Sequence, residues 1–215
     1  MDVLFDNLDV FANGFYTTIQ LFVVSGIGSL ILGTALAMLR VSPVPVFRSA
    51  GTLYVTIVRN TPLTLVFLFF AFAYPRLDMV DLSFFMTACV ALTVYTSAFI
   101  CEVVRSGINT VPVGQAEAAR ALGLGFGQVL GTIVLPQAFR SVLPPMMSML
   151  IALLKNTTIA AGFSVAEAGQ IRSILSERGE NQLLTLIFVA VGFILLVMIL
   201  TSVQRTLEKR WSVAR

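Results

Sequence analysis

Residues 114–137, GQAEAARALGLGFGQVLGTIVLPQ, differ from the rest of the chain in composition and in pattern. The first half is rich in alanine and carries Glu117 and Arg120, and glycines follow at 123, 125 and 127. Alanine, glutamate and arginine favour a helix, whereas a glycine in the position of Gly123 is typical of a helix end. We therefore predict two short helices that join at Gly123, the second of which ends at Pro136.

The residues on either side of this segment are apolar enough to lie in lipid. Hydrophobic residues make up 57% of the 215-residue chain and charged residues 12%, whereas soluble domains carry about 25% charged residues. We predict an all-α, polytopic membrane protein that forms one transmembrane domain over residues 1–215. Five runs approach the roughly 20 apolar residues that a membrane-spanning helix needs; they cover about 16–39, 53–74, 84–104, 145–163 and 183–203.

Basic residues in the loops predict the orientation, because cytoplasmic loops carry an excess of lysine and arginine. With the N-terminus outside, nine basic residues lie in inner segments and three in outer segments. The inner ones are Arg40, Arg48, Arg105, Arg120, Arg140, Arg205, Lys209, Arg210 and Arg215; the outer ones are Arg76, Arg172 and Arg178. We expect the C-terminus and the loop 105–140 to be cytoplasmic. We expect no cleaved secretory signal, because no basic residue precedes Arg40.

The predicted hairpin of residues 114–137 suits contact with a protein better than contact with lipid. An interfacial helix carries a basic polar face and bulky apolar anchors, and the first helix has neither. Its alanines leave it thin enough to enter a groove. The alternative is a helix that rests on the lipid surface, with Glu117 and Arg120 paired at a spacing of three.

The segment resembles the EAA loop of bacterial ABC-importer permeases. The chain has Glu-Ala-Ala, then glycine after three residues, isoleucine after nine more, and Leu-Pro after one more; these are Glu117, Ala118, Ala119, Gly123, Ile133, Leu135 and Pro136. The resemblance continues through YVTIVRNTPLTLVFLFF (54–70), YTSAFICEVVRSGINTVPVGQ (95–115) and LLKNTTIA (153–160). It covers roughly residues 14–205, is weakest over 164–182, and is strongest to the polar amino-acid subfamily, especially actinobacterial glutamate-uptake permeases.

This resemblance implies a type I importer permease in a bacterial cell membrane. The hairpin is then a coupling helix that seats in a cleft of a cytoplasmic ATPase dimer, with Glu117, Ala118, Ala119, Arg120 and Gly123 as the coupling residues. Glu117 is expected to meet a basic residue of the ATPase, and Gly123 to allow the turn. The resemblance also implies a second permease subunit, related or identical, and an extracytoplasmic solute-binding protein.

Several kinds of site are not expected in this chain. A phosphate-binding P-loop needs G-x-x-x-x-G-K-[ST], and neither of the two lysines, Lys155 and Lys209, follows a glycine at that spacing. ATP and Mg²⁺ are therefore expected on a partner ATPase. The chain has no histidine, the commonest metal ligand, and no nucleophile paired with a base, so we expect no metal site and no catalytic site. No basic cluster suits nucleic acid.

Two basic residues within predicted spans are candidates for the substrate path. Ionisable groups in a membrane usually face protein or water, so Arg59 and Lys155 could pair with the carboxylate of an amino acid. Asn60, Thr61, Asn156, Thr157 and Thr158 lie beside them in sequence and could form hydrogen bonds to the same solute. Two cations without a deep carboxylate favour an anionic substrate. Alternatively, Arg59 extends to the cytoplasmic interface, and Pro62 only kinks the second span.

Other polar and aromatic residues are assigned structural roles. We expect Glu102 to pair with Arg105 at the membrane interface, Glu167 to be a solvated charge rather than a receptor contact, and the phenylalanines at 67, 69, 70 and 72 to face lipid. Cys89 and Cys101 are expected to be buried thiols, since a spacing of twelve residues in one helix is too long for a disulfide.

Two further classes of protein remain as alternatives to a permease subunit. A self-contained secondary transporter or channel would need coupling carboxylates within its spans, and only Glu102 comes close. A membrane scaffold without a solute path would not need Arg59 or Lys155. Five spans do not comfortably enclose a path, so we expect a dimer.

Overall fold

The computed structural model describes residues 2–78 and 80–211, and all regular structure in these residues is helical. The α-helices are α1 (Asp2–Phe5), α2 (Leu8–Val41), α3 (Pro45–Arg59), α4 (Leu63–Leu68), α5 (Phe84–Ile108), α6 (Val113–Ala121), α7 (Phe126–Val129), α8 (Leu135–Asn156), α9 (Ile171–Glu177) and α10 (Gln182–Trp211). The π-helical turns are η1 (Phe69–Ala73) and η3 (Leu130–Val134); the 3₁₀ turns are η2 (Tyr74–Leu77), η4 (Thr157–Phe163) and η5 (Ala168–Gln170). The predicted all-α class is confirmed.

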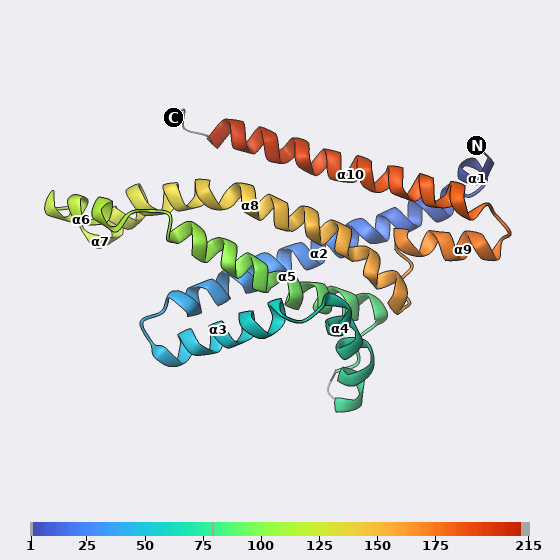
Figure 1. The fold of residues 1–215 in the computed structure, drawn as a ribbon, viewed down its shortest axis with the longest axis horizontal. Helices are drawn as coiled ribbons and strands as arrows, with labels where there is room; N and C mark the ends of the chain where they lie inside the picture. Colours follow the sequence, from blue (N-terminus) through green and yellow to red (C-terminus); the bar gives the residue numbers. More distant parts are fainter. Residues whose placement is uncertain (1, 79, 212–215) are drawn as a thin grey trace.

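Four continuous helical stretches are long and apolar enough to cross a membrane: Leu8–Val41, Phe84–Ile108, Gly127–Phe163 and Gln182–Arg210. Each of them contains a predicted run and extends beyond it by one or more turns. These helices lie roughly along the long axis of the molecule (Figure 1). The N-terminus lies near α9 at one end, whereas the C-terminus, α6 and α7 lie at the other. The segments with the basic excess therefore share one end.

Small residues bring α2 and α5 into close contact. Ser25, Ser29, Gly33 and Ala37 recur every fourth residue of α2 and are all buried, so they form one stripe along the helix. The Ser25 hydroxyl donates to the carbonyl oxygen of Cys89 at 3.4 Å. Close backbone approach through small residues is a common way for helices to associate in membranes, where lipid supplies no hydrophobic driving force.

The second predicted span, about 53–74, falls on two helical arms rather than on one continuous helix. Helix α3 ends at Arg59, and Leu63–Leu77 continues at 104° to it. Proline has no N–H and moves the residue before it away from helical geometry, so Pro62 breaks the chain where a kink was considered. The two arms count as a fifth span only as a bent pair.

The fourth helical stretch begins well before Pro145, where the predicted span started. Pro136 was expected to end the second hairpin helix, but it lies in the first turn of α8 and the chain stays helical through it. The π-helical turn η3 directly precedes this proline. A π turn changes the hydrogen-bond pattern locally, at the point where Pro136 cannot donate. Pro144 and Pro145 also lie inside α8.

Phe67 does not face lipid as expected. Its side chain is fully buried, and its ring stacks on that of Phe163 at a centroid distance of 5.0 Å. Phe69 and Phe72 are half or more exposed, as the lipid-facing interpretation requires. Both exposed rings belong to the π-helical turn η1, whereas the buried ring belongs to the preceding helix α4.

Glu167 is buried rather than solvated, which corrects the expectation. Its side chain is 0% exposed, and its carboxylate accepts hydrogen bonds from the Thr18 hydroxyl (3.0 Å) and the Gly169 N–H (2.7 Å). The Ala168 N–H donates to the same Thr18 oxygen at 3.0 Å. Glu167 therefore ties the segment after η4 to helix α2. Burial raises the pKa of the Glu167 carboxyl, and these hydrogen bonds offset only part of that effect.

The α2–α5 contact can be tested with two glycines of the same helix. A Cβ on Gly33 would lie 2.6 Å from Ile100 Cγ2 and 2.8 Å from the Ser97 carbonyl oxygen, whereas one on Gly26 would meet nothing closer than 3.7 Å. Gly33→Ala should lower the free energy of unfolding by about 1–3 kcal/mol through overpacking, and the melting temperature by several degrees. Gly26→Ala should change stability by less than about 1 kcal/mol. Equal melting temperatures of the purified proteins would contradict close packing at Gly33.

The burial of Glu167 predicts a pH dependence of stability. The folded protein holds this proton more tightly than the unfolded chain, so folding is favoured at low pH and loses stability as pH rises from the ordinary carboxyl value, 4.5, through the raised pKa. Glu167→Gln cannot ionise and should show a smaller decline in melting temperature over this range. Thermal melts of both proteins at a series of pH values measure this. Parallel curves would show that the pKa of Glu167 is the same in the folded and the unfolded protein.

Candidate functional site

The hairpin between α5 and α8 is closed by a glycine in the left-handed conformation. Gly123 has φ of +86°, which side chains rarely adopt. Its N–H donates to the Arg120 carbonyl (3.0 Å), and the Leu124 N–H donates to the Ala119 carbonyl (3.2 Å). These two bonds form a Schellman motif, which satisfies carbonyls at the end of α6. The predicted turn at Gly123 is confirmed.

The tip of the hairpin presents charged and apolar side chains to the surroundings. Glu117 and Arg120 are both exposed, and within residues 2–78 and 80–211 they form no ion pair with each other. Leu122 is 85% exposed at the turn. Ala118 is exposed, whereas Ala119 is buried on the side of α6 that faces the rest of the hairpin. Free charges beside an exposed leucine suit a protein partner better than lipid headgroups.

The base of the hairpin is fixed where α5 and α8 meet. A Cβ on Gly107 would lie 2.0 Å from Val142 Cγ2, so the two helices approach closely there. The Thr110 hydroxyl donates to the Gly107 carbonyl (2.7 Å), and it lies 3.0 Å from the Ser141 hydroxyl. The base of the hairpin is therefore held against both α5 and α8.

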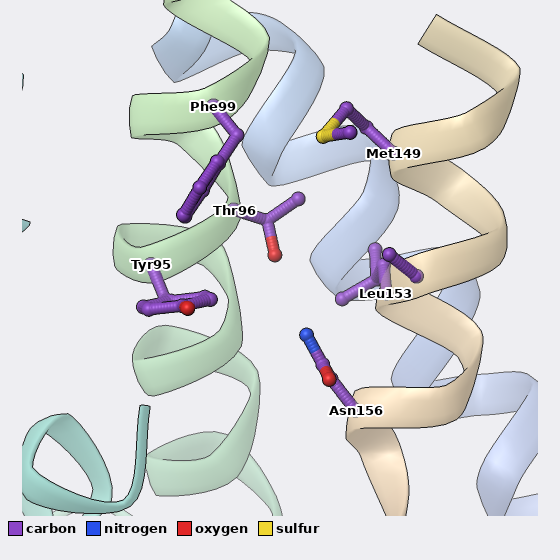
Figure 2. Close-up of a pocket in the computed structure, with 7 residues that line it drawn as sticks. Tyr95, Thr96, Phe99, Met149, Leu153 and Asn156 are labelled. Atoms are coloured by element: carbon purple, nitrogen blue, oxygen red, sulfur yellow. The ribbon is translucent and has the colours of Figure 1, made fainter. Parts of the chain in front are cut away.

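A pocket of about 160 Å³ lies between α5 and α8 (Figure 2). Helix α5 contributes Tyr95, Thr96 and Phe99 to its wall, and α8 contributes Met149, Ala152, Leu153 and Asn156. In Figure 2, the polar groups of Thr96 and Asn156 point into the space between the two helices. The wall is otherwise apolar or aromatic, which is the usual character of a small-molecule site.

Two polar side chains of this pocket lack hydrogen-bond partners among the described residues. Thr96 is 4% exposed, and its hydroxyl oxygen is buried without a hydrogen bond among the described residues. The side chain of Asn156 likewise has no hydrogen bond recorded within that part of the chain. Leaving a buried hydroxyl unpaired costs about 1–3 kcal/mol, so a bound solute that pairs with Thr96 would recover this energy.

Arg59 lies beside this pocket and takes part in a cluster of charges. Its guanidinium carbon is 5.5 Å from the centre of the Phe99 ring, within the range of a cation–π contact. Its Nη1 is 3.3 Å from Glu102 Oε1, and Arg105 Nη2 is 3.6 Å from Glu102 Oε2. Arg40 also pairs with Glu102. The expected Glu102–Arg105 pair is thus present, as part of a larger cluster.

The other residues predicted for the substrate path lie in different surroundings. Asn60 and Thr61 are at the break after α3 and donate to carbonyls of their own helix, Thr56 (2.7 Å) and Ile57 (2.8 Å). Thr157 is fully buried and donates to Leu154, and Thr158 donates to Lys155. Lys155 is exposed and does not line the pocket. Of the seven predicted residues, only Asn156 lines this pocket, with Arg59 next to it.

Sequence reasoning missed Tyr95, Thr96, Phe99 and Met149. Each is unremarkable in sequence, and only the pairing of α5 with α8 brings them together. One feature of the sequence could have indicated this site: Thr96 is a polar residue at the centre of an apolar run. Glu102 was recognised as a charge in a span, but its contacts with Arg40 and Arg59 come from two other helices.

Comparisons with known proteins agree with this geometry. Residues 29–213 match the family described as binding-protein-dependent transport system inner membrane component. A glutamate transport system permease protein of Corynebacterium efficiens is 48% identical over 194 residues, which cover 85% of each chain. A probable glutamine ABC transporter permease protein of Bacillus subtilis is 36% identical and covers 98% of this chain and 97% of its own.

A solved structure shows the same fold. The crystal structure of an amino acid ABC transporter with histidines aligns with a TM-score of 0.90 and 23% identity, and the alignment covers 96% of both chains. A hairpin between two spans, a membrane bundle with a bent second span, and a match over most of the chain all lead to one assignment. The protein belongs to the family of inner membrane components of binding-protein-dependent transport systems.

Proposed function

We propose that this chain is the permease subunit of an ATP-driven importer for amino acids, with glutamate as its preferred substrate. The observation that carries this proposal is the pocket between α5 and α8, which shares both of its helices with the hairpin. A force applied at α6 reaches Gly107 and Ser141, and the same two helices carry Thr96 and Asn156. Such a connection is what a separate motor needs in order to change access to a solute site.

The proposal places the hairpin in the cytoplasm and the N-terminus outside. The end of the molecule that holds α6, α7 and the C-terminus (Figure 1) also holds the loop between α2 and α3. Eight of the nine basic residues predicted to be cytoplasmic lie in or next to these segments, and the ninth, Arg215, lies outside the described residues. Positive charge is retained on the cytoplasmic side of membrane proteins.

The partners follow from the family and from the hairpin. The family implies an ATPase and a solute-binding protein. In our proposal, an ATPase dimer receives α6, with Glu117 facing a basic residue of its cleft and Ala118, Arg120 and Gly123 shaping the contact. ATP and Mg²⁺ are bound by that ATPase and not by this chain. A second permease subunit, related or identical, completes the path.

The choice of glutamate rests on charge. The pocket wall itself is neutral, so it suits the zwitterionic part of any polar amino acid. The Arg59 guanidinium, placed over Phe99, and the exposed Lys155, which precedes Asn156 in α8, add positive charge near it. An anionic side chain gains from both, whereas a glutamine side chain gains only hydrogen bonds. Glutamate and glutamine, the solutes in the names of the two relatives described above, differ in this side-chain charge.

Coupling can be tested by reversing the charge of Glu117. Glu117→Arg should lower uptake and substrate-stimulated ATP hydrolysis by at least about tenfold in the reconstituted complex, because like charges across an interface cost several kcal/mol. The protein should still insert into the membrane. Glu208→Arg, the same change near the end of α10, is the matched control and should retain most activity. Wild-type rates for Glu117→Arg would remove the hairpin from coupling.

The pocket can be tested with a substitution of Thr96 that keeps its shape. Thr96→Val removes an unpaired buried hydroxyl, so stability should stay the same or rise. The substrate concentration for half-maximal uptake should increase about tenfold through loss of one hydrogen bond, and Thr96→Ser should restore it. Uptake of radiolabelled glutamate and thermal melting together decide the matter. An unchanged half-maximal concentration in Thr96→Val would mean that this pocket does not bind the solute.

A further inference from the structure

A second cavity, of about 310 Å³, lies beside the arginine cluster and reaches the base of the hairpin. Its wall includes Arg59 from the end of α3, Glu102 and Ser106 from α5, Thr110 from the hairpin, and Ser141 from α8. Apart from Glu102, these polar side chains can all donate hydrogen bonds: one is a guanidinium group and the others are hydroxyls. Arg59 also borders the first pocket through Phe99, so the two cavities are neighbours on either side of one guanidinium group.

The charges next to this cavity do not balance. Three guanidinium groups share the single carboxylate of Glu102, which leaves two positive charges uncompensated. The Arg40 side chain is only 11% exposed, whereas those of Arg59 and Arg105 are 45% and 40% exposed. Arg40 is thus the buried partner of Glu102, and the other two remain available. Arg105 Nε is buried and has no hydrogen bond within the described residues.

Hydroxyl groups line the same cavity as Arg59. The Ser106 side chain lines the cavity, and no hydrogen bond is recorded for it in residues 2–78 and 80–211. The Thr110 and Ser141 hydroxyls lie 3.0 Å apart, and both approach the Gly107 carbonyl. A guanidinium group facing several hydroxyls is a suitable surface for a carboxylate, since charged acceptors form the stronger hydrogen bonds.

We propose that this cavity is a second binding site, for the carboxylate of an anionic amino acid. The carboxylate pairs with the Arg59 guanidinium and replaces the 3.3 Å contact between Arg59 and Glu102. It also accepts a hydrogen bond from the Ser106 hydroxyl. Because Thr110 and Ser141 hold the hairpin base, an occupant also contacts the segment through which the motor acts. Binding at this site therefore makes the coupling hairpin respond to the concentration of anionic amino acid in the cytoplasm. This inference rests on the proposed import function for its ligand, but none of the residues that line this cavity also lines the first pocket.

The test uses the assembled transporter in lipid nanodiscs, without binding protein or nucleotide. Phenylglyoxal modifies accessible arginines, and mass spectrometry measures the modified fraction of Arg59 as L-glutamate is added. Ser106→Asp and Ser106→Asn introduce side chains of nearly equal size, and only the first adds a negative charge. If the cavity binds the anion, L-glutamate should protect Arg59 from modification by phenylglyoxal. The protecting concentration should rise at least about tenfold in Ser106→Asp, from charge repulsion at short range, and far less in Ser106→Asn.

Further arms separate this site from the first pocket and from a general anion site. Thr96→Val should leave the protection of Arg59 unchanged even where it weakens uptake. If protection fails together with uptake in Thr96→Val, the second site is refuted and the first pocket stands. Absence of protection, or equal protection in the two Ser106 variants, also refutes it. Protection by inorganic phosphate at lower concentrations than by L-glutamate refutes the carboxylate assignment.

Discussion

The close contact between α2 and α5 is the constraint on which the other parts of the structure depend. Ser25, Ser29 and Gly33 allow the helix backbones to approach until a single added methyl group would collide. This contact fixes the rotation of α5 about its axis. With that rotation set, Thr96 faces α8 while Glu102 faces Arg40 at the end of α2. One line of small residues thus determines where both the neutral pocket and the charged cluster lie.

Helices α5 and α8 form a frame with the hairpin at one end and the pocket between them. The frame is tight at Gly107, where no side chain fits between the helices, and looser near Thr96 and Asn156, where the pocket lies. Packed elements tend to move as units rather than deform continuously. A rotation of the hairpin is therefore expected to change the spacing of the helices at the pocket, where there is room, and not at the hairpin base.

The parts of the structure that local chemistry determines were predictable from sequence. The turn at Gly123 follows from its place between a helix-forming segment and a second apolar run, and the all-α class follows from the long apolar runs. The break at Pro62 was considered only as a kink, because a proline alone does not fix the angle between two arms. Glu167 could not be placed, since its burial depends on Thr18, 149 residues away in the chain. The same holds for Thr96, whose role appears only once α5 is paired with α8.

The placement of positive charge outside the first pocket has a physical consequence for transport. A carboxylate held by a guanidinium group in a dry, closed pocket would be bound strongly, because charge interactions strengthen as the dielectric constant falls. A transported solute must bind well enough to enter and weakly enough to leave. In this protein the pocket wall is neutral, and Arg59 lies behind the Phe99 ring, half exposed and already shared with Glu102. The positive charge attracts an anion through the pocket towards the hairpin end, while competition from Glu102 limits how tightly Arg59 can hold it.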